Sequence, residues 1–258
     1  MQRLDQFFAL ADELFSGKHP DFQAIDVPFH DYEHTMEVLV CMVCMLEARL
    51  KARVEPRLNA RQTELAVVAA LFHDSGYLRS RSDTTGTGAK FTFMHVLRSC
   101  SNVATYLPAL NVSISEVHAV NEAIQCTGPT SKISQRHFAN DSDAIIGCAL
   151  ATADYLGQMA APDYPDELDA LFGEFKESYD YYHVAHSARL FSSAEELKGN
   201  TAFFWVNIVK PKLDNDFQAV YRFLNSPYPS GINRYITGIE ANLAKIDQGL
   251  ARHSDKIA

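Results

Sequence analysis

Apolar residues recur along most of the chain at spacings of three and four positions, which is the pattern of helices that bury one face. Alternation of apolar and polar residues, which is typical of strands, is scarce, and the helix-favouring residues Ala, Leu, Met, Glu and Gln are frequent. Capping residues support two helix starts, at 111–113 (Asn-Val-Ser) and 140–142 (Asn-Asp-Ser). The pattern predicts an all-α protein with helices over about 3–15, 31–53, 61–74, 92–107, 113–126, 141–160, 166–186, 201–210, 214–225 and 231–251.

Three polar stretches, 17–30, 79–90 and 127–140, separate these helices and are expected to be loops. The stretch 79–90 (RSRSDTTGTGAK) is rich in Gly, Ser and Thr. Two interpretations stay open for it, a lid over a neighbouring site and a solvated connector. No internal repeat and no long linker divides the chain, so we expect one domain over residues 1–258.

Composition and charge narrow the classes of partner. With 258 residues, of which 47% are hydrophobic, the chain can bury a substantial core. The net charge of −9 argues against a nucleic-acid polymer or an anionic membrane surface as the main partner, but it allows a small phosphorylated substrate held by a metal. The sequence shows no signal peptide and no apolar run approaching the ~20 residues of a membrane span, so we expect a cytoplasmic protein. Association into a homo-oligomer stays open.

The five cysteines form no disulfide framework, and their odd number favours reduced thiols. Cys41 and Cys44 have the spacing of a redox or zinc motif, but no second pair accompanies them. Because both lie inside an apolar helical run, we interpret them as core residues.

The dipeptide His73-Asp74 gives the first sign of chemistry. It ends the apolar run of residues 65–72 and is followed by Ser75 and Gly76, of which the glycine is suited to a helix stop. Burying an unpaired carboxylate costs several kcal/mol, so such a pair needs a partner. Imidazole and carboxylate are both ligands of divalent first-row metals, which makes a cation the expected partner.

Two other segments carry matching residues. His30 and His34 lie one turn apart at a helix start, and Asp154 shares a helical face with Leu150 and Gln158 inside an apolar helix. Helical bundles build metal sites from side chains that project off facing helices. Mixed nitrogen and oxygen ligands suit Mn, Fe, Co, Ni or Zn, while Mg fits only a weak second site. The predicted metal ligands are His34, His73, Asp74 and Asp154.

The order of these residues resembles that of the HD-domain metal-dependent phosphohydrolases, and is most similar to their bacterial, cyclic-nucleotide-phosphodiesterase-like branch. Residues 29–34 (FHDYEH) resemble the Tyr-His-Asn-x-x-His motif of that branch, with Phe for Tyr and Asp for Asn. Residues 71–74 (LFHD) resemble its central pair, and 153–159 (ADYLGQM) its Ala-Asp-x-x-x-Gln-Met segment. The resemblance covers about residues 25–210. It implies a multi-helix HD-domain bundle with a core over about 25–165 and a helical C-terminal extension over about 166–258.

The resemblance also implies a mechanism, in which a metal-activated water cleaves a phosphomonoester or phosphodiester of a small, nucleotide-like substrate. His30 would be the general acid, Asp74 would be both a ligand and a catalytic residue, and Asp74 and Asp154 would together help to orient the water. His95 and Gln158 are the expected substrate-binding residues, although His95 could equally lie on a solvent-facing stripe. Thr201 stands near the place where cyclic-nucleotide phosphodiesterases carry a base-binding Gln. This departure from the family pattern argues against a cyclic nucleotide as the substrate.

Some relatives hold a second cation through two further histidines, for which His95 and His118 are the available candidates. His118 points away from the buried face of its helix, so we favour one tight metal. Two other functions stay open. One is an HD-fold metal-dependent oxygenase, and the other is a non-enzymatic helical binding protein whose histidines are structural.

Overall fold

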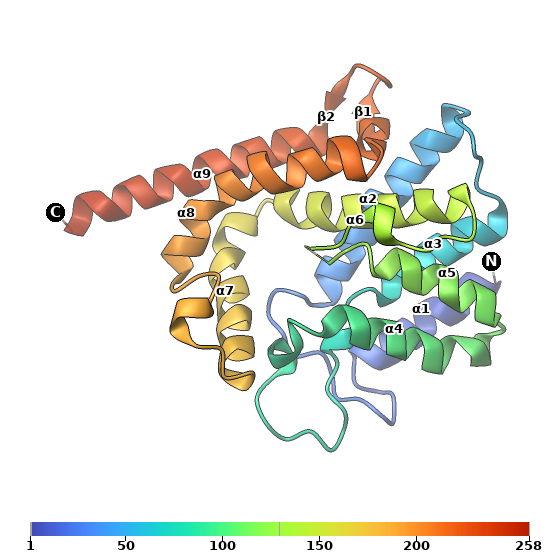
Figure 1. Ribbon diagram of the computed structural model, residues 1–258, viewed down its shortest axis with the longest axis horizontal. Coiled ribbons are helices and arrows are strands. Elements are labelled where there is room, and N and C mark those ends of the chain that lie inside the picture. Colours follow the sequence, from blue (N-terminus) through green and yellow to red (C-terminus); the bar gives the residue numbers. More distant parts are fainter. Residues whose placement is uncertain (1, 129, 258) are drawn as a thin grey trace.

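The prediction of an all-α fold is confirmed by a computed structural model, which describes residues 2–128 and 130–257 (Figure 1). Within this part of the chain the only sheet is a two-stranded antiparallel ribbon of β1 (Asn225–Ser226) and β2 (Ile232–Asn233). The helices are α1 (Gln2–Phe15), α2 (Tyr32–Lys51), α3 (Ala60–Phe72), α4 (His95–Tyr106), α5 (Ile114–Ile124), α6 (Asp141–Ala160), α7 (Tyr164–Tyr181), α8 (Ala194–Phe204) and α9 (Arg234–Ile257).

The helix starts follow local capping chemistry. Asn59 caps α3 and Ser113 caps α5, each in a capping box with the residue three positions on. Asn140 accepts a hydrogen bond from the backbone of Asp143 at the start of α6. Of the two capping stretches singled out in the sequence, each therefore begins a helix.

The prediction of two α-helices near the C-terminus was wrong in the type of helix. The sequence indicated helices over 201–210 and 214–225, whereas α8 begins earlier and continues into wider π-turns at Trp205–Val209 and Lys212–Asp216 and a 3-10 turn at Val220–Leu224. Pro211 lies between the two π-turns. A proline has no N–H to donate and its ring clashes with the preceding turn, which favours a locally widened helix.

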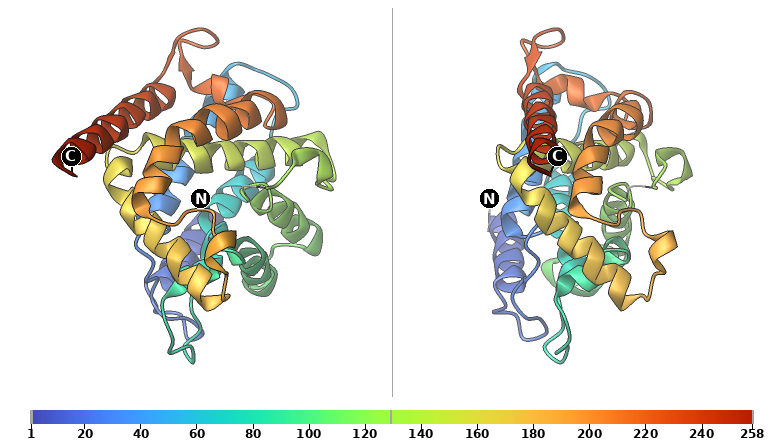
Figure 2. Two further views of the ribbon diagram at one scale, coloured as in Figure 1. Left: turned by 60° about the vertical axis from the view of Figure 1, so that its left-hand side comes forward. Right: turned by 90° about the vertical axis from the view of Figure 1, so that its left-hand side faces the viewer.

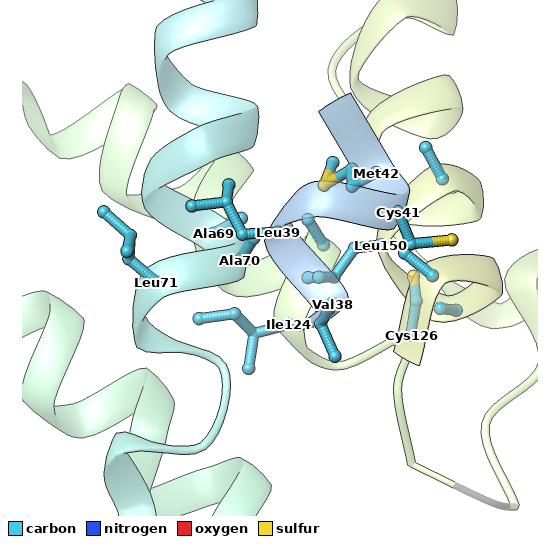
Figure 3. Close-up of a cluster of buried hydrophobic side chains, with 14 of the residues drawn as sticks. Val38, Leu39, Cys41, Met42, Ala69, Ala70, Leu71, Ile124, Cys126 and Leu150 are labelled. Carbon is cyan, nitrogen blue, oxygen red and sulfur yellow. The ribbon is translucent and has the colours of Figure 1, made fainter. Parts of the chain in front are cut away.

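One hydrophobic cluster contains buried residues from Phe7 to Ile246. Its centre is the packing of α2 against α6, and Figure 3 shows side chains of both helices meeting those of α3 and α5. Cys41 is fully buried in this cluster, and all five thiols are free. Gly157 of α6 faces the α2 backbone so closely that an added Cβ would lie 3.3 Å from the Val38 nitrogen. This close approach brings the start of α2 beside the second half of α6.

Helix α7 leaves α6 at an angle of 115° and runs along another side of the molecule, while α4 and α5 lie opposite to it (Figures 1 and 2). No single described helix is long and apolar enough to cross a membrane, although the bent pair of α6 and α7 passes on length and composition alone.

Side-chain bonds hold both ends of the 79–90 loop, which extends beyond the helices in Figure 1. At its first end, Arg79 pairs with Asp26, and at its second end the buried ammonium of Lys90 pairs with Asp83 at 2.6 Å. Glu177 of α7 accepts hydrogen bonds from both the backbone N–H and the hydroxyl of Thr87. The loop is therefore tied to α7, and whether it acts as a lid stays a prediction.

Candidate metal centre

The side chains predicted as metal ligands come together from α2, the end of α3, and α6. His34 lies in the first turn of α2, where the N-cap residue Asp31 accepts a hydrogen bond from its backbone N–H at 2.9 Å. His73 and Asp74 directly follow the last residue of α3, which ends two residues earlier than predicted. A 3-10 turn, Ser75–Tyr77, comes after them. Asp154 lies on the buried side of α6.

The ligand atoms converge on one point. The Nε2 atoms of His34 and His73 each lie 3.3 Å from Oδ2 of Asp74, and they lie 3.5 and 3.7 Å from Oδ1 of Asp154. Neither Nε2 atom nor Oδ2 of Asp74 has a hydrogen-bond partner, although all three are buried. Buried polar atoms without partners are rare and require an explanation. Lone pairs directed at a shared cation supply it, and the group His34, His73 and Asp74 can hold a metal ion.

The tautomer of His73 suits this role. Its Nδ1 atom lies 2.8 Å from the carbonyl of Ala70, a group at the end of α3 that lacks a helical partner. Donation of the Nδ1 proton to that carbonyl leaves the Nε2 lone pair free for a metal. Local helix geometry therefore orients His73 as a ligand would require.

Without a cation, protons hold the cluster together. Burial alone would lower the pKa of His34, but the adjacent carboxylates of Asp154 and Asp74 raise it to about 9. Burial would also lower the pKa of His73. The neighbouring aspartates outweigh this effect and raise that pKa well above its usual value. Burial would raise the pKa of Asp154, yet the two histidines hold it at about 2, and they hold that of Asp74 well below its usual range. In the metal-free protein the positive charges of the two imidazolium groups balance the two carboxylates. A divalent cation would balance the same two charges in their place.

His30 lies next to this cluster and is oriented by a residue that the sequence analysis missed. Its Nδ1 atom is 2.5 Å from Oε2 of Glu174, which is 1% exposed. The other oxygen of Glu174 accepts hydrogen bonds from the backbone N–H groups of Phe29 at 2.7 Å and His30 at 3.2 Å. The ring centroids of His30 and His34 are 5.5 Å apart. Glu174 therefore fixes both the backbone and the ring of His30 beside the metal ligands.

His95 lies at the edge of the site and not on a solvent-facing stripe. Its Nδ1 atom is 2.6 Å from the carbonyl of Thr92, and its Nε2 atom is 3.7 Å from Oδ1 of Asp74. The neighbouring residues on that helical face are also engaged. Arg98 donates to the carbonyls of Gly76 and Leu78, and Asn102 donates to that of Ser75. These bonds hold the turn that follows Asp74.

Tyr77 is a second residue that the sequence analysis missed. Its ring is fully buried and stacks on His30 and His95, with centroid distances of 4.6 and 4.7 Å. The two histidine rings are only 6.1 Å apart, so both lie over the same side of the tyrosine. Both imidazoles therefore pack on the Tyr77 ring, which sets the spacing between them.

Gln158 lies apart from these residues, in a small pocket that His34 also lines. Its amide donates to the carbonyl of Asp154 at 2.9 Å. The pocket walls include neither His30 nor His95. Gln158 and His95, predicted together as substrate-binding residues, are thus on different surfaces of the site. His118 lies on the surface, with 57% of its side chain exposed, in agreement with its exclusion from the ligands.

Comparison with protein-family models, with curated proteins and with solved structures finds no match to this chain.

Proposed function

We propose that this protein is a metal-dependent phosphohydrolase of the HD-domain type. The observation that carries the proposal is the convergence of unpartnered, buried ligand atoms from His34, His73 and Asp74 beside an imidazole, His30, that is held by Glu174. The first group is suited to a divalent cation, and the second is suited to proton transfer at a bond next to that cation.

His34, His73, Asp74 and Asp154 would hold the cation. When bound, it would polarise a phosphoryl oxygen and lower the pKa of a coordinated water. The side chain of Asp154 is 14% exposed, more than those of the other three ligands, so it borders the side from which water and substrate arrive. Its carboxylate would accept a hydrogen bond from the attacking water and so fix its direction.

His30 would protonate the leaving alkoxide. Glu174 accepts a hydrogen bond from the Nδ1–H group of the imidazole, and in the imidazolium form the second proton, on Nε2, would be the one donated to the leaving oxygen. The arrangement matches the general pattern in which a carboxylate fixes the tautomer and orientation of a catalytic histidine. The ring has little freedom to turn away because Tyr77 stacks on it.

The imidazole of His95 would contact the phosphoryl group or a second, weakly bound cation such as Mg²⁺. The two oxygens of Asp74 face different histidines, with Oδ2 near His34 and His73 and Oδ1 near His95. One imidazole and one carboxylate oxygen are few ligands, so any second site would bind its ion weakly.

We propose a small, nucleotide-like phosphodiester or phosphomonoester as the substrate. The ion pairs of the described cluster involve only histidines and aspartates, so a bound cation would supply the positive charge that an ester anion requires. The hydroxyl of Thr201 is buried and bonded to the Leu197 carbonyl, so it offers no group to clamp a base. This arrangement gives no support to a cyclic-nucleotide substrate.

The experiment that tests the proposal is a screen of phosphomonoesters, phosphodiesters and nucleotides with Mn²⁺, Co²⁺, Ni²⁺, Zn²⁺ and Mg²⁺. We expect the protein to retain a metal through gel filtration and to hydrolyse one of these classes. His73→Ala should lose both metal and turnover, while the surface variant His118→Ala should keep both. Normal turnover by His73→Ala, or a wild-type protein that takes up no metal, would refute the proposal.

A further inference from the structure

A cavity of about 200 Å³ lies toward the C-terminal end of α2, away from the candidate metal centre. It is bounded by the second half of α2, the first half of α3 and the loop that joins them. An apolar cavity of about 150 Å³ holds a benzene molecule, so this one has room for a phenyl ring with a short substituent. Most of its walls are aliphatic side chains, among them Leu39, Met42, Leu46, Leu58 and Val67.

Three charged residues also line this cavity, and two of them are paired with a neighbour. Glu47 pairs with Lys51 at 2.6 Å, and Arg57 pairs with Glu55 at 3.0 Å. These four side chains are all more than half exposed. The third charged residue, Arg49, is only 4% exposed, and it forms no ion pair with any carboxylate of the described residues. The most buried charge of the cavity is therefore the one that lacks a counter-ion.

The guanidinium of Arg49 also has donors to spare. Its Nη1 atom donates to the carbonyl of Pro56 at 2.6 Å, and the group lies 5.9 Å from the ring centroid of Phe223. No described residue accepts a hydrogen bond from Nε or Nη2, yet neither atom is fully enclosed, so both reach accessible space. Burial lowers the pKa of Arg49, and the carboxylate of Glu55, which is held by Arg57, offsets this only in part. A buried cation of this kind is costly unless an anion accompanies it.

We propose that this cavity binds a small apolar carboxylate of the arylacetate kind, with its carboxylate on the guanidinium of Arg49 and its ring against the aliphatic walls. A carboxylate accepts two parallel N–H bonds from a guanidinium and neutralises its charge, which an uncharged ligand of the same shape cannot do. Arg49 follows His34 by 15 residues in the same helix, which corresponds to about 22 Å along its axis. The site is therefore separate from the candidate metal centre, and it does not depend on the proposed function.

The test locates binding and measures its dependence on charge. Protein with isotope-labelled methionine methyl groups would be titrated with phenylacetate and with phenylacetamide, its uncharged counterpart of the same size. The NMR signal of Met42, assigned with Met42→Leu, would report binding at the cavity wall. We expect phenylacetate to bind with a Kd of about 0.1 mM. Phenylacetamide should bind about 10- to 100-fold more weakly, because it cannot form the charge-assisted bonds.

Arg49→Met keeps the stem of the side chain and removes its charge. It should bind phenylacetate about 10- to 100-fold more weakly and leave the affinity for phenylacetamide nearly unchanged. The matched control is Arg57→Met, which removes the paired guanidinium of the same cavity and should bind phenylacetate as the wild type does. Val43→Phe serves if Arg49→Met folds poorly. Val43 lines the cavity and is 44% exposed, so the larger ring should block both ligands without disturbing the core.

The outcomes separate this site from the metal centre. His73→Ala should bind phenylacetate normally, and loss of binding in this variant would place the carboxylate at the metal centre and overturn the proposal. Equal affinity for the two ligands, or wild-type affinity for phenylacetate in Arg49→Met, would overturn the recognition of a carboxylate by Arg49. A Met42 signal that moves with neither ligand, at concentrations far above the expected Kd, would show that the cavity is not a binding site. None of these results bears on phosphate-ester turnover, which tests the proposed function.

Discussion

At the scale of single residues, Glu174 has the most specific role that the structure reveals. One buried carboxylate accepts hydrogen bonds from two backbone N–H groups and from the ring N–H of His30, so most of its acceptor capacity is directed to this one segment. Charge-assisted bonds of this kind are stronger than neutral ones and fix direction as well as distance. If His30 protonates the leaving group, its efficiency depends on Glu174.

Glu174→Gln should separate this role from metal binding. The amide oxygen can still accept the backbone bonds, but the amide no longer balances a charge on His30. We expect turnover of an alkyl phosphate ester to fall by about 100-fold, the lower end of what general acids contribute. A p-nitrophenyl ester needs little proton donation and should be affected much less, with metal content unchanged. Equal slowing of both esters would argue that Glu174 has only a structural role.

Sequence reasoning found the residues that converge at the candidate centre but not the residues that support them, and distance along the chain explains the difference. His73 and Asp74 were visible because an apolar run ends at an imidazole and a carboxylate. Glu174 is separated from His30 by 144 residues, and a glutamate on a partly exposed helix carries no distinguishing pattern. The sequence gives no sign of the role of Tyr77, because its stacking on two histidines depends on where α4 begins.

At the scale of secondary-structure elements, periodicity predicted the helices up to α7 within a few residues, and the exceptions have local causes. The helix expected over 61–74 ends at Phe72, because the chain must pass the start of α4. An added Cβ on Gly76 would lie 1.9 Å from the carbonyl oxygen of His95, so only glycine fits there. Such a tertiary contact is invisible in hydrophobic spacing.

The contact between α2 and α6 offers a test of how elements position the site. Gly157 lies three residues after Asp154, and Val38 lies four residues after His34. A bulky residue at 157 would therefore push apart the two helices that carry these ligands. Gly157→Val should destabilise the protein by about 1–3 kcal/mol through overpacking and weaken metal affinity by about tenfold.

Gly173→Ala is the matched control, because an added Cβ meets nothing within 4 Å there. In this exposed helical position, alanine should stabilise the fold by about 0.5–1 kcal/mol. Urea unfolding and a metal titration would measure both variants. Unchanged metal affinity in Gly157→Val would show that the α2–α6 distance does not set the ligand geometry.

At the scale of the whole molecule, the centre joins elements that are distant in sequence, so its ionisation affects global stability. The raised pKa of His34, about 9, means that its ion pairs stabilise the metal-free fold fully below the unfolded value of about 6.5. That contribution is lost as pH rises through about 9. Asp154, with a pKa near 2, contributes above about 3.9 and loses its contribution as pH falls through about 2.

A bound cation replaces these protons, so its stabilising effect should grow with pH. We expect the increase in Tm on adding Co²⁺ to be small at pH 6 and larger at pH 9, where His34 of the metal-free protein is about half deprotonated. Thermal unfolding of the protein with and without Co²⁺ across this range would measure it. Asp74→Ala should show little increase at any pH. An increase in Tm that shrinks toward alkaline pH would contradict the assignment of His34 and His73 as ligands.

Helix α7 lies outside the ligand set, yet it carries Glu174, which holds His30, and Glu177, which holds the 79–90 loop. The two glutamates are three residues apart and therefore occupy neighbouring positions on the same helix. Any displacement of this helix would consequently disturb both attachments in a single motion. If the protein has the proposed function, a molecule in that displaced form would keep its cation while His30 lost its orientation, so that the acid and not the metal would set the difference between an idle and an active form.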